Sequence, residues 1–96
     1  MSGVEGKSLR ELEKIVKGFS NHRRIEIIKL LSANPELSLA DISHKLKINF
    51  KTASEHVLRL SRAGLVSKRY GGRCVYHKNT DLAGDVLTFL RMLERK

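Results

Sequence analysis

The chain of 96 residues contains one cysteine, Cys74, one proline, Pro35, and no tryptophan. A single cysteine excludes an internal disulfide and fits a reducing compartment, so we expect a cytoplasmic protein. No apolar run approaches the roughly 20 residues that span a bilayer, and the first residues lack the hydrophobic stretch of a secretion signal. We therefore predict no membrane partner, a flexible N-terminal tail over residues 1–7, and one domain over residues 8–96.

Acidic residues are scarce in one third of the chain. Residues 44–78 carry nine lysines and arginines and a single acid, Glu55, which gives this segment a formal charge of +8. The remaining residues carry 10 basic and 9 acidic side chains, so nearly all of the net charge of +9 lies in this segment. Such localisation indicates a surface that binds a polyanion. An anionic membrane is disfavoured, because membrane-surface helices usually carry large aromatic residues opposite their cations.

Residues 49–64 predict a helix with two unlike faces. Helical spacing gathers Ala53, Val57 and Leu60 on one apolar face, while Asn49 suits an N-cap and Gly64 a left-handed residue beyond the helix end. The other face carries the side-chain types that contact base edges and phosphates in a DNA major groove. Its candidate DNA-binding residues are Asn49, Lys51, Thr52, Ser54, Glu55, Leu58 and Arg59, with Arg62 on the same face. Taken alone, the pattern also fits an ordinary surface helix with solvated charges.

Three further helices are predicted before this one. Ser8 begins the first with a capping-box spacing to Glu11. Residues 21–33 form the second, which Pro35 ends because the residue before a proline avoids helical geometry. The third runs from the cap at residues 38–41 to residue 45 or 46, and a short turn joins it to the helix at 49–64. A helix, a turn and a second helix with a basic outer face form the helix-turn-helix arrangement.

After Gly64 the apolar period changes to two, which predicts strands over residues 65–70 and 73–78 joined by the pair Gly71–Gly72. Paired glycines suit a two-residue hairpin turn. A basic hairpin that follows a recognition helix is a wing, and a plain hairpin with solvated cations is the alternative. The candidate DNA-binding residues of the wing are Lys68, Arg69 and Arg73.

The register of this hairpin stays open. A two-residue turn would put Val75 on the face of Val66. A three-residue turn that includes Arg73 would instead put Tyr76 on that face. The sequence does not choose between the two.

A last helix, capped by Thr80 or Asp81, is predicted over residues 82–96. This helix and the first one have apolar stripes that are broad for helices of one small domain. A contiguous exposed patch of this kind usually marks an interface, so we predict a homodimer joined through both terminal helices. The alternative is that the two helices cover one another within a monomer. The predicted interface residues are Leu9, Leu12, Val16, Val86, Phe89, Leu90 and Leu93.

Four stretches of the chain resemble a known family. They read F-S-N-H-R-R-I-E-I-I-K-L-L at 19–31, L-A-D-I-S-H-K-L at 39–46, T-A-S-E-H-V-L-R-L-S-R-A-G-L-V at 52–66 and R-Y-G-G-R-C-V-Y-H at 69–77. In this order they resemble the ArsR/SmtB family of winged-helix transcriptional repressors, over nearly all of residues 8–95. The resemblance implies a homodimer on an imperfect palindrome, with helix 49–63 of each protomer in a major groove. Each 65–78 hairpin would then lie along a flanking backbone or minor groove.

The chain departs from the metal-binding members of this family. Those members carry two cysteines in an E-L-C-x-C-D-L motif, whereas residues 36–42 here read E-L-S-L-A-D-I. Soft-metal binding needs those thiolates, and residues 82–96 contain no histidine for the family's other site. We therefore predict no metal and no cofactor. His56 is expected to make a local hydrogen bond rather than to bind a metal, and Cys74 lacks a second cysteine for a redox pair.

These observations predict a mainly α fold with a small β-hairpin, arranged as a winged helix-turn-helix of four helices, a hairpin and a fifth helix. No nucleophile and base pair, paired carboxylates or phosphate-binding loop supports an enzyme. The predicted function is a sequence-specific transcriptional regulator, a homodimeric repressor that binds a palindromic operator in double-stranded DNA. The main alternative is a winged-helix module that binds protein or RNA without a DNA operator. A sensor with a ligand between its terminal helices is a further alternative.

Overall fold

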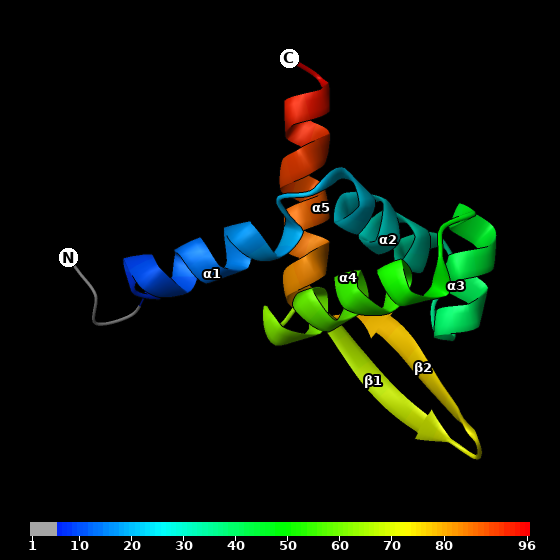
Figure 1. Cartoon of the computed structure of the whole chain (residues 1–96). Helices are drawn as coiled ribbons and strands as arrows, with labels where there is room; N and C mark the ends of the chain where they lie inside the picture. Colours follow the sequence, from blue (N-terminus) through cyan, green and yellow to red (C-terminus); the bar gives the residue numbers. More distant parts are fainter. Residues whose placement is uncertain (1–5) are drawn as a thin grey trace.

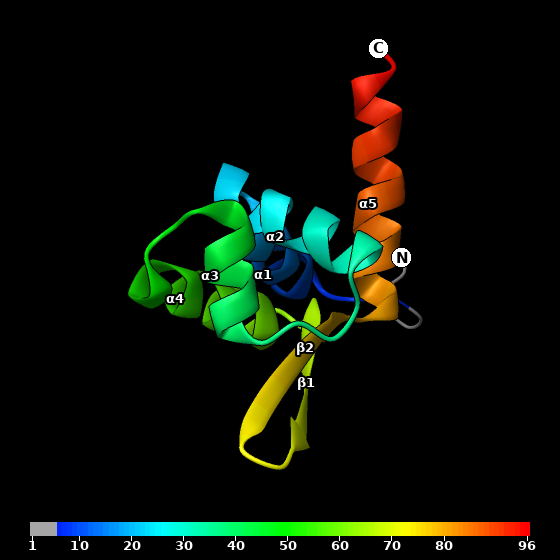
Figure 2. The same cartoon turned by 90° about the vertical axis from the view of Figure 1, so that its right-hand side faces the viewer.

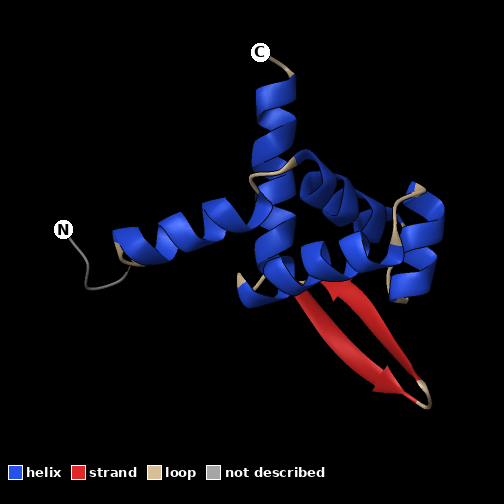
Figure 3. Ribbon diagram, viewed as in Figure 1, coloured by secondary structure: helices blue, strands red, loops and turns tan. Residues whose placement is uncertain are grey.

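The computed structural model describes residues 6–96, and it confirms the predicted winged helix-turn-helix, mainly helical with a β-hairpin (Figures 1 and 3). Residues 1–5 of the predicted tail lie outside the described residues. Figure 2 shows the hairpin and the C-terminal end of the last helix projecting from opposite sides of the helical body. The elements are α1 (Leu9–Phe19), α2 (His22–Ala33), α3 (Leu39–Leu46), α4 (Phe50–Arg62), β1 (Val66–Gly71), β2 (Cys74–Asn79) and α5 (Asp81–Glu94).

Side-chain caps begin α1 and α3 where the sequence predicts them. Ser8 and Glu11 form a capping box at α1, and Ser38 and Asp41 form a second one at α3. Each box gives partners to two backbone N–H groups that helix geometry leaves unpaired. The start of each helix is therefore determined by residues within one turn of it.

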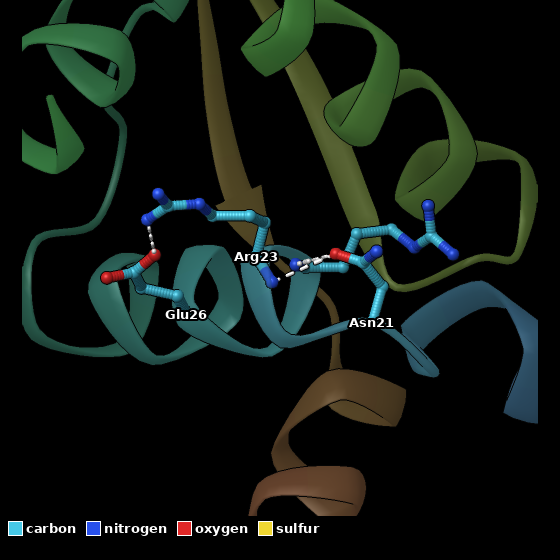
Figure 4. A network of polar contacts seen from close by, with 4 residues as sticks. Asn21, Arg23 and Glu26 are labelled. Atoms are coloured by element: carbon cyan, nitrogen blue, oxygen red, sulfur yellow. Dashed lines mark hydrogen bonds and ion pairs between the residues drawn. The ribbon is translucent and has the colours of Figure 1, made fainter. Parts of the chain in front are cut away.

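The second helix begins at a similar cap, drawn in Figure 4. The Oδ1 atom of Asn21 accepts hydrogen bonds from the backbone N–H of Arg23 at 2.9 Å and of Arg24 at 3.2 Å. Arg23 also forms an ion pair with Glu26 at 2.9 Å. The helix ends at Ala33, two residues before the proline, as predicted.

One apolar core holds the helices together. Ala53, Val57 and Leu60 of α4 are buried, as helical spacing predicted, and they belong to the same core as Ile27 and Ile28 of α2. Burying one such aliphatic side chain contributes about 1.5–3 kcal/mol. Because this face of α4 is held against α2, the opposite face of α4 is turned toward solvent.

The hairpin turn lies one residue later than predicted. Gly71 is opposite Cys74 in the antiparallel pairing, so the turn residues are Gly72 and Arg73. Gly72 has a φ of +61°, and the first central position of a two-residue turn accepts glycine at a positive φ without steric cost. The prediction of a turn at Gly71–Gly72 is therefore wrong, because Gly71 is the last residue of β1.

The observed pairing also decides which residues share a face of the hairpin. Tyr70 is opposite Val75, and Val66 lies four residues before Tyr70 on the same strand. Side chains alternate along a strand, so Val75 shares a face with Val66, as expected for a two-residue turn. Arg69 and Tyr76, which are opposite one another, lie on the other face.

The terminal helices diverge, with α1 extending to the left and the C-terminal half of α5 extending upward in Figure 1. Leu9, Leu12 and Val16 on α1, and Phe89 and Leu93 on α5, remain 47–84% exposed. The alternative in which these helices cover one another within a monomer is therefore wrong. Over residues 6–96, no helix combines the length and apolarity needed to cross a membrane.

Val86 and Leu90 differ from the other predicted interface residues. Val86 is 7% exposed and belongs to the core together with Ala83 and Leu87, and Leu90 packs partly against the same core. A side chain that its own chain already covers offers little surface to a partner. The first turns of α5 pack on the domain, so the predicted interface residues of α5 that stay most accessible are Phe89 and Leu93.

A close contact between α1 and α4 provides a test of the packing. A Cβ atom on Gly18 would lie 2.4 Å from the Cβ of Ala63, so Gly18→Ala should lower the free energy of unfolding by about 1–3 kcal/mol, as overpacking does. The control Gly84→Ala has no atom within 4 Å of the new Cβ and should raise it by about 0.5–1 kcal/mol. Urea denaturation at one protein concentration measures both. A Gly18→Ala variant as stable as the parent would contradict this packing.

Candidate nucleic-acid interface

Both ends of α4 are fixed by local hydrogen bonds. The Oδ1 atom of Asn49 accepts from the backbone N–H of Lys51 at 2.8 Å and of Thr52 at 3.3 Å, which confirms the predicted cap. At the other end Gly64 has a φ of +80°, and its N–H and that of the next residue donate to carbonyls of the last turn. This is a Schellman arrangement, as glycine at this position predicts. The carboxamide oxygen of Asn49 is thereby committed to the cap.

The other predicted contact residues of α4 lie along one side of the helix, which we call the reader face: Lys51, Thr52, Ser54, Glu55, Leu58 and Arg59. The side chains of Lys51, Glu55 and Arg59 are exposed, and those at the margins are half-buried. Leu58 is 40% exposed. Within residues 6–96, none of these three charged side chains forms an ion pair. The reader face therefore presents free charges, hydroxyls and an apolar contact to solvent.

The three predicted wing cations are not equivalent. Lys68 and Arg73 are exposed. In contrast, the Nε and Nη2 atoms of Arg69 lie 2.8 and 2.6 Å from Oε1 of Glu36, and its guanidinium lies 4.8 Å from the ring centroid of Tyr76. Arg69 therefore ties the hairpin to the segment before α3 instead of presenting a free charge.

A second contact ties the wing to the same segment. The backbones of His77 and Leu37 exchange hydrogen bonds of 2.8 and 3.1 Å, and Nδ1 of His77 lies 3.0 Å from the Leu37 carbonyl oxygen. A carbonyl only accepts, so Nδ1 carries the proton of this neutral ring. His77 is 2% exposed, and this hydrogen bond satisfies one of its two polar atoms in the interior. These contacts, together with Arg69, set the angle of the wing relative to α3 and α4.

A groove of about 390 Å³ lies between the wing and the helices α3 and α4, and it contains two exposed aromatic side chains. Phe50 and Tyr70 are among its lining residues, and so are the wing cations Lys68 and Arg73. Tyr70 was not among the predicted contact residues of the wing, which were selected for their positive charge. The alternation of Lys68 and Tyr70 along one strand was the available signal.

His56 lies beside the reader face, and its hydrogen bond joins α4 to Arg24 of α2 rather than to a near neighbour in the chain, so the prediction of a local bond is wrong. Its Nδ1 atom lies 3.3 Å from Nη1 of Arg24, and a guanidinium only donates, so Nδ1 is the acceptor in a neutral ring. Burial, and then the positive charge of Arg24, lower the pKa of His56. Burial likewise lowers the pKa of His77.

These two histidines predict how stability depends on pH. Their pKa values in the folded state lie below the ordinary value of about 6.5, so the unfolded chain binds more protons between the two values. The free energy of unfolding should be constant above about pH 7 and should fall as the pH drops below about 6.5. Urea midpoints from pH 8 to pH 5 measure this.

A matched pair of variants tests the assignment. His56→Gln should reduce the fall below pH 6.5, whereas His44→Gln, at an exposed position, should leave it unchanged. Glu11 and Glu94, whose pKa values are lowered by hydrogen bonds from Ser8 and Lys29, contribute only near pH 4.5 and below. Equal slopes for the two histidine variants between pH 7 and pH 5 would contradict the role of His56.

The C-terminal end of α4 meets a group of cations on α1. A cleft of about 350 Å³ between the two helices, which we call the α1–α4 cleft, is lined by Arg10, Lys14, Lys17, Arg59 and Arg62 and by one acid, Glu13. Helix α1 was predicted only as an interface helix, and its cations were not among the predicted site residues. The signal was their spacing, because residues 10, 14 and 17 recur along one side of a helix.

The stretch that holds cysteines in metal-binding members has another role here. The hydroxyl of Ser38 accepts from the backbone N–H of Asp41 at 3.1 Å, and the Asp41 carboxylate accepts from the N–H of Ser38 at 3.2 Å. Both side chains are therefore committed to the cap of α3. Within residues 6–96, no three His, Cys, Asp or Glu side chains lie close enough to share a metal ion.

A helix-turn-helix whose second helix is exposed on its polar side, followed by a basic hairpin, defines a winged-helix DNA-binding domain. Residues 20–67 match the family described as winged helix-turn-helix DNA-binding. A transcriptional activator from Vibrio cholerae, HlyU, is 30% identical over 95 residues, which cover 92% of this chain and 85% of that protein. A cadmium resistance transcriptional regulatory protein, a CadC homologue from Staphylococcus aureus, is 30% identical over 71 residues, which cover 74% of this chain and 59% of that protein.

The fold also matches a solved structure. The homodimeric winged helix-turn-helix DNA-binding domain of Mb0332 from Mycobacterium bovis, a possible ArsR-family transcriptional regulator, superposes with a TM-score of 0.82 at 24% identity. The match covers 96% of this chain and 91% of that domain. The chain belongs to the ArsR/SmtB-type winged helix-turn-helix transcriptional regulators, and it is not an enzyme.

Proposed function

We propose that this regulator acts as a homodimer that binds an imperfect palindrome in double-stranded DNA. Each α4 enters a major groove with its reader face, and each wing lies along the flanking backbone. The observation that carries the proposal is the reader face itself, where Lys51, Glu55 and Arg59 are exposed and free of ion pairs among residues 6–96. Such side chains suit guanine and phosphate oxygens and the cytosine amine.

Within the wing, Lys68 and Arg73 are proposed as the phosphate contacts. Arg69 was predicted as a third contact, but its charge is already compensated by Glu36. We therefore assign to Arg69 the role of positioning the wing. The contacts with the DNA backbone are assigned to Lys68 and Arg73.

The dimer is proposed to form through the uncovered apolar faces of α1 and α5, with a second copy of this chain as the partner. Five apolar side chains there are 47–84% exposed: Leu9, Leu12, Val16, Phe89 and Leu93. The solved Mb0332 domain is described as homodimeric, which supports the same assembly here. Two-fold symmetry would place two reader faces on successive half-sites, which is why a palindromic operator is expected.

The direction of regulation is proposed as repression, by occlusion of a promoter in the cytoplasm. The HlyU relative is called an activator, so the family relationship alone does not set this direction. The cadmium of the CadC name is not carried over, because Ser38 and Ala40 stand where metal-binding members have thiolates.

Selection of bound fragments from a random pool of duplexes tests the proposal. The expected result is a motif with two inverted half-sites, bound at least about a thousand-fold more tightly than unrelated duplex. Titration of single-stranded RNA in the same buffer is the matched arm. Tighter binding to RNA, or no enriched duplex motif, would favour the alternative of a winged-helix module without a DNA operator.

A further inference from the structure

The α1–α4 cleft carries more positive charge than its surroundings neutralise. Its five basic side chains face one acid, Glu13, and that carboxylate is already paired with Lys17 at 3.1 Å. Several cations that line one cleft make it a favourable place for an anion.

A further cation, Arg24, contacts the backbone of Lys17, one of the residues that line the cleft. Arg24 donates to the backbone carbonyl of Lys17 at 3.4 Å and to His56, and its Nε atom is buried without a partner. Within residues 6–96 it pairs with no carboxylate. Burial, and then the charge of Arg59, lower the pKa of Arg24. Arg24 therefore adds a fourth guanidinium, without a carboxylate partner among residues 6–96, to those of Arg10, Arg59 and Arg62 at this end of α4.

The cleft continues the reader face rather than forming a separate surface. On a helical wheel Arg62 lies within about 40° of Lys51, Glu55 and Leu58. The wing follows α4 but projects toward the end where α3 lies, whereas α1 lies at the other end (Figure 1). The reader face is thus bordered by cations at both ends, from the wing at one end and from α1 at the other.

The cations of α1 do not belong to its apolar stripe. On a helical wheel Arg10, Lys14 and Lys17 are centred about 130° from the stripe of Leu9, Leu12 and Val16. Dimerisation through that stripe therefore leaves the cleft open. The close approach of Gly18 to Ala63 brings the backbones of α1 and α4 together, so the cations of both helices line the same cleft.

We propose that the α1–α4 cleft is a phosphate-binding site that holds the DNA backbone at the end of the recognition helix opposite the wing. This inference rests on the proposed function, and it adds α1 to the DNA interface. Guanidinium and ammonium groups converging from two rigid helices suit phosphate oxygens. The wing and the cleft would then contact the backbones on the two sides of one major groove, which fixes how α4 lies in it.

The test compares the salt dependence of a variant that loses charge in the cleft with that of a control that loses charge elsewhere. Arg10→Gln with Lys14→Gln should lower the slope of log binding constant against log salt by roughly two per protomer, and weaken binding at low salt on the order of tenfold. The preference for the selected duplex over unrelated duplex should be kept. The control Arg95→Gln removes one charge at the far end of α5 and should leave the slope unchanged.

A charge-preserving variant and a free anion complete the design. Arg10→Lys with Lys14→Arg should bind like the parent, which separates charge from packing. Inorganic triphosphate is titrated at constant ionic strength while backbone amides of α1 are followed by NMR. One alternative result is that the cleft binds triphosphate with saturation below about millimolar, and loses that binding in the Gln variant, while the salt slope of DNA binding does not change. That result would assign the cleft to a free phosphate compound instead of the DNA backbone.

The outcomes separate the two proposals. A parent protein that binds no duplex selectively would overturn the proposed function, while the triphosphate titration would still test the cleft. The phosphate site would be overturned by a different result. In that case the parent binds its duplex selectively, the salt slope is the same in the parent, the Gln variant and Arg95→Gln, and triphosphate does not saturate the cleft.

Discussion

Leu93→Glu is expected to convert the protein to a monomer and to lower its affinity for a duplex with two half-sites by roughly a hundred-fold or more. Leu93 is 50% exposed on the apolar face of α5, so a carboxylate there would be desolvated without a partner in the dimer. Affinity for a single half-site should not change, because the reader face is untouched. Sedimentation measures the mass, and fluorescence anisotropy measures both affinities.

The control for this prediction is Thr88→Glu. Thr88 is exposed on the same helix, about 140° around the axis from Leu93. The substitution therefore adds the same charge outside the proposed interface. Leu90 is less suitable, because it packs partly on the core and a charge there would also destabilise the fold. A Leu93→Glu protein that remains dimeric, or a Thr88→Glu protein that dissociates equally, would exclude α5 as the interface.

Glu55→Gln is expected to change which base is preferred at one position of each half-site. A carboxylate accepts from the cytosine amine, whereas a glutamine amide suits adenine, and each such contact discriminates by about 1–3 kcal/mol. Glu55 is exposed on the reader face, and an amide of the same shape leaves the packing around it unchanged. Repeating the selection of bound duplexes with the variant measures the change.

Lys68→Ala provides the contrast to this variant, because a phosphate contact carries no sequence information. We expect weaker binding to all duplexes alike and a salt slope lowered by about one per protomer. Arg69→Ala should behave differently from both, because it releases the wing from Glu36 without removing a free cation. An unchanged base preference in Glu55→Gln would exclude Glu55 from base recognition, whatever the wing variants do.

Local signals predicted the elements well. The capping pairs of α1 and α3, the Asn49 cap and the Gly64 end of α4 each involve groups within five residues of one another. Their hydrogen bonds satisfy helix ends whatever the rest of the chain does. Helical spacing similarly predicted the buried face of α4, and therefore its exposed face, because an amphipathic helix can dock in only one orientation.

The hairpin shows where local signals were insufficient. Two adjacent glycines allow the turn to begin at either one, and both choices keep an antiparallel pair. Packing decided between them: the bridge between His77 and Leu37, together with Arg69 on Glu36, joins the strands to a segment more than 30 residues away. No sequence period records a contact over that separation.

The sequence by itself determined the order and the ends of the helices, the polar face of the recognition helix and the concentration of positive charge around it, because each follows from groups a few residues apart. The tertiary structure alone decided that Arg69 is neutralised, that Val86 is covered while Leu93 is not, and that the cations of α1 meet those of α4. Each of these depends on which surfaces of distant segments pack together. The free energy that selects such packing comes from the whole core rather than from any one turn of the chain.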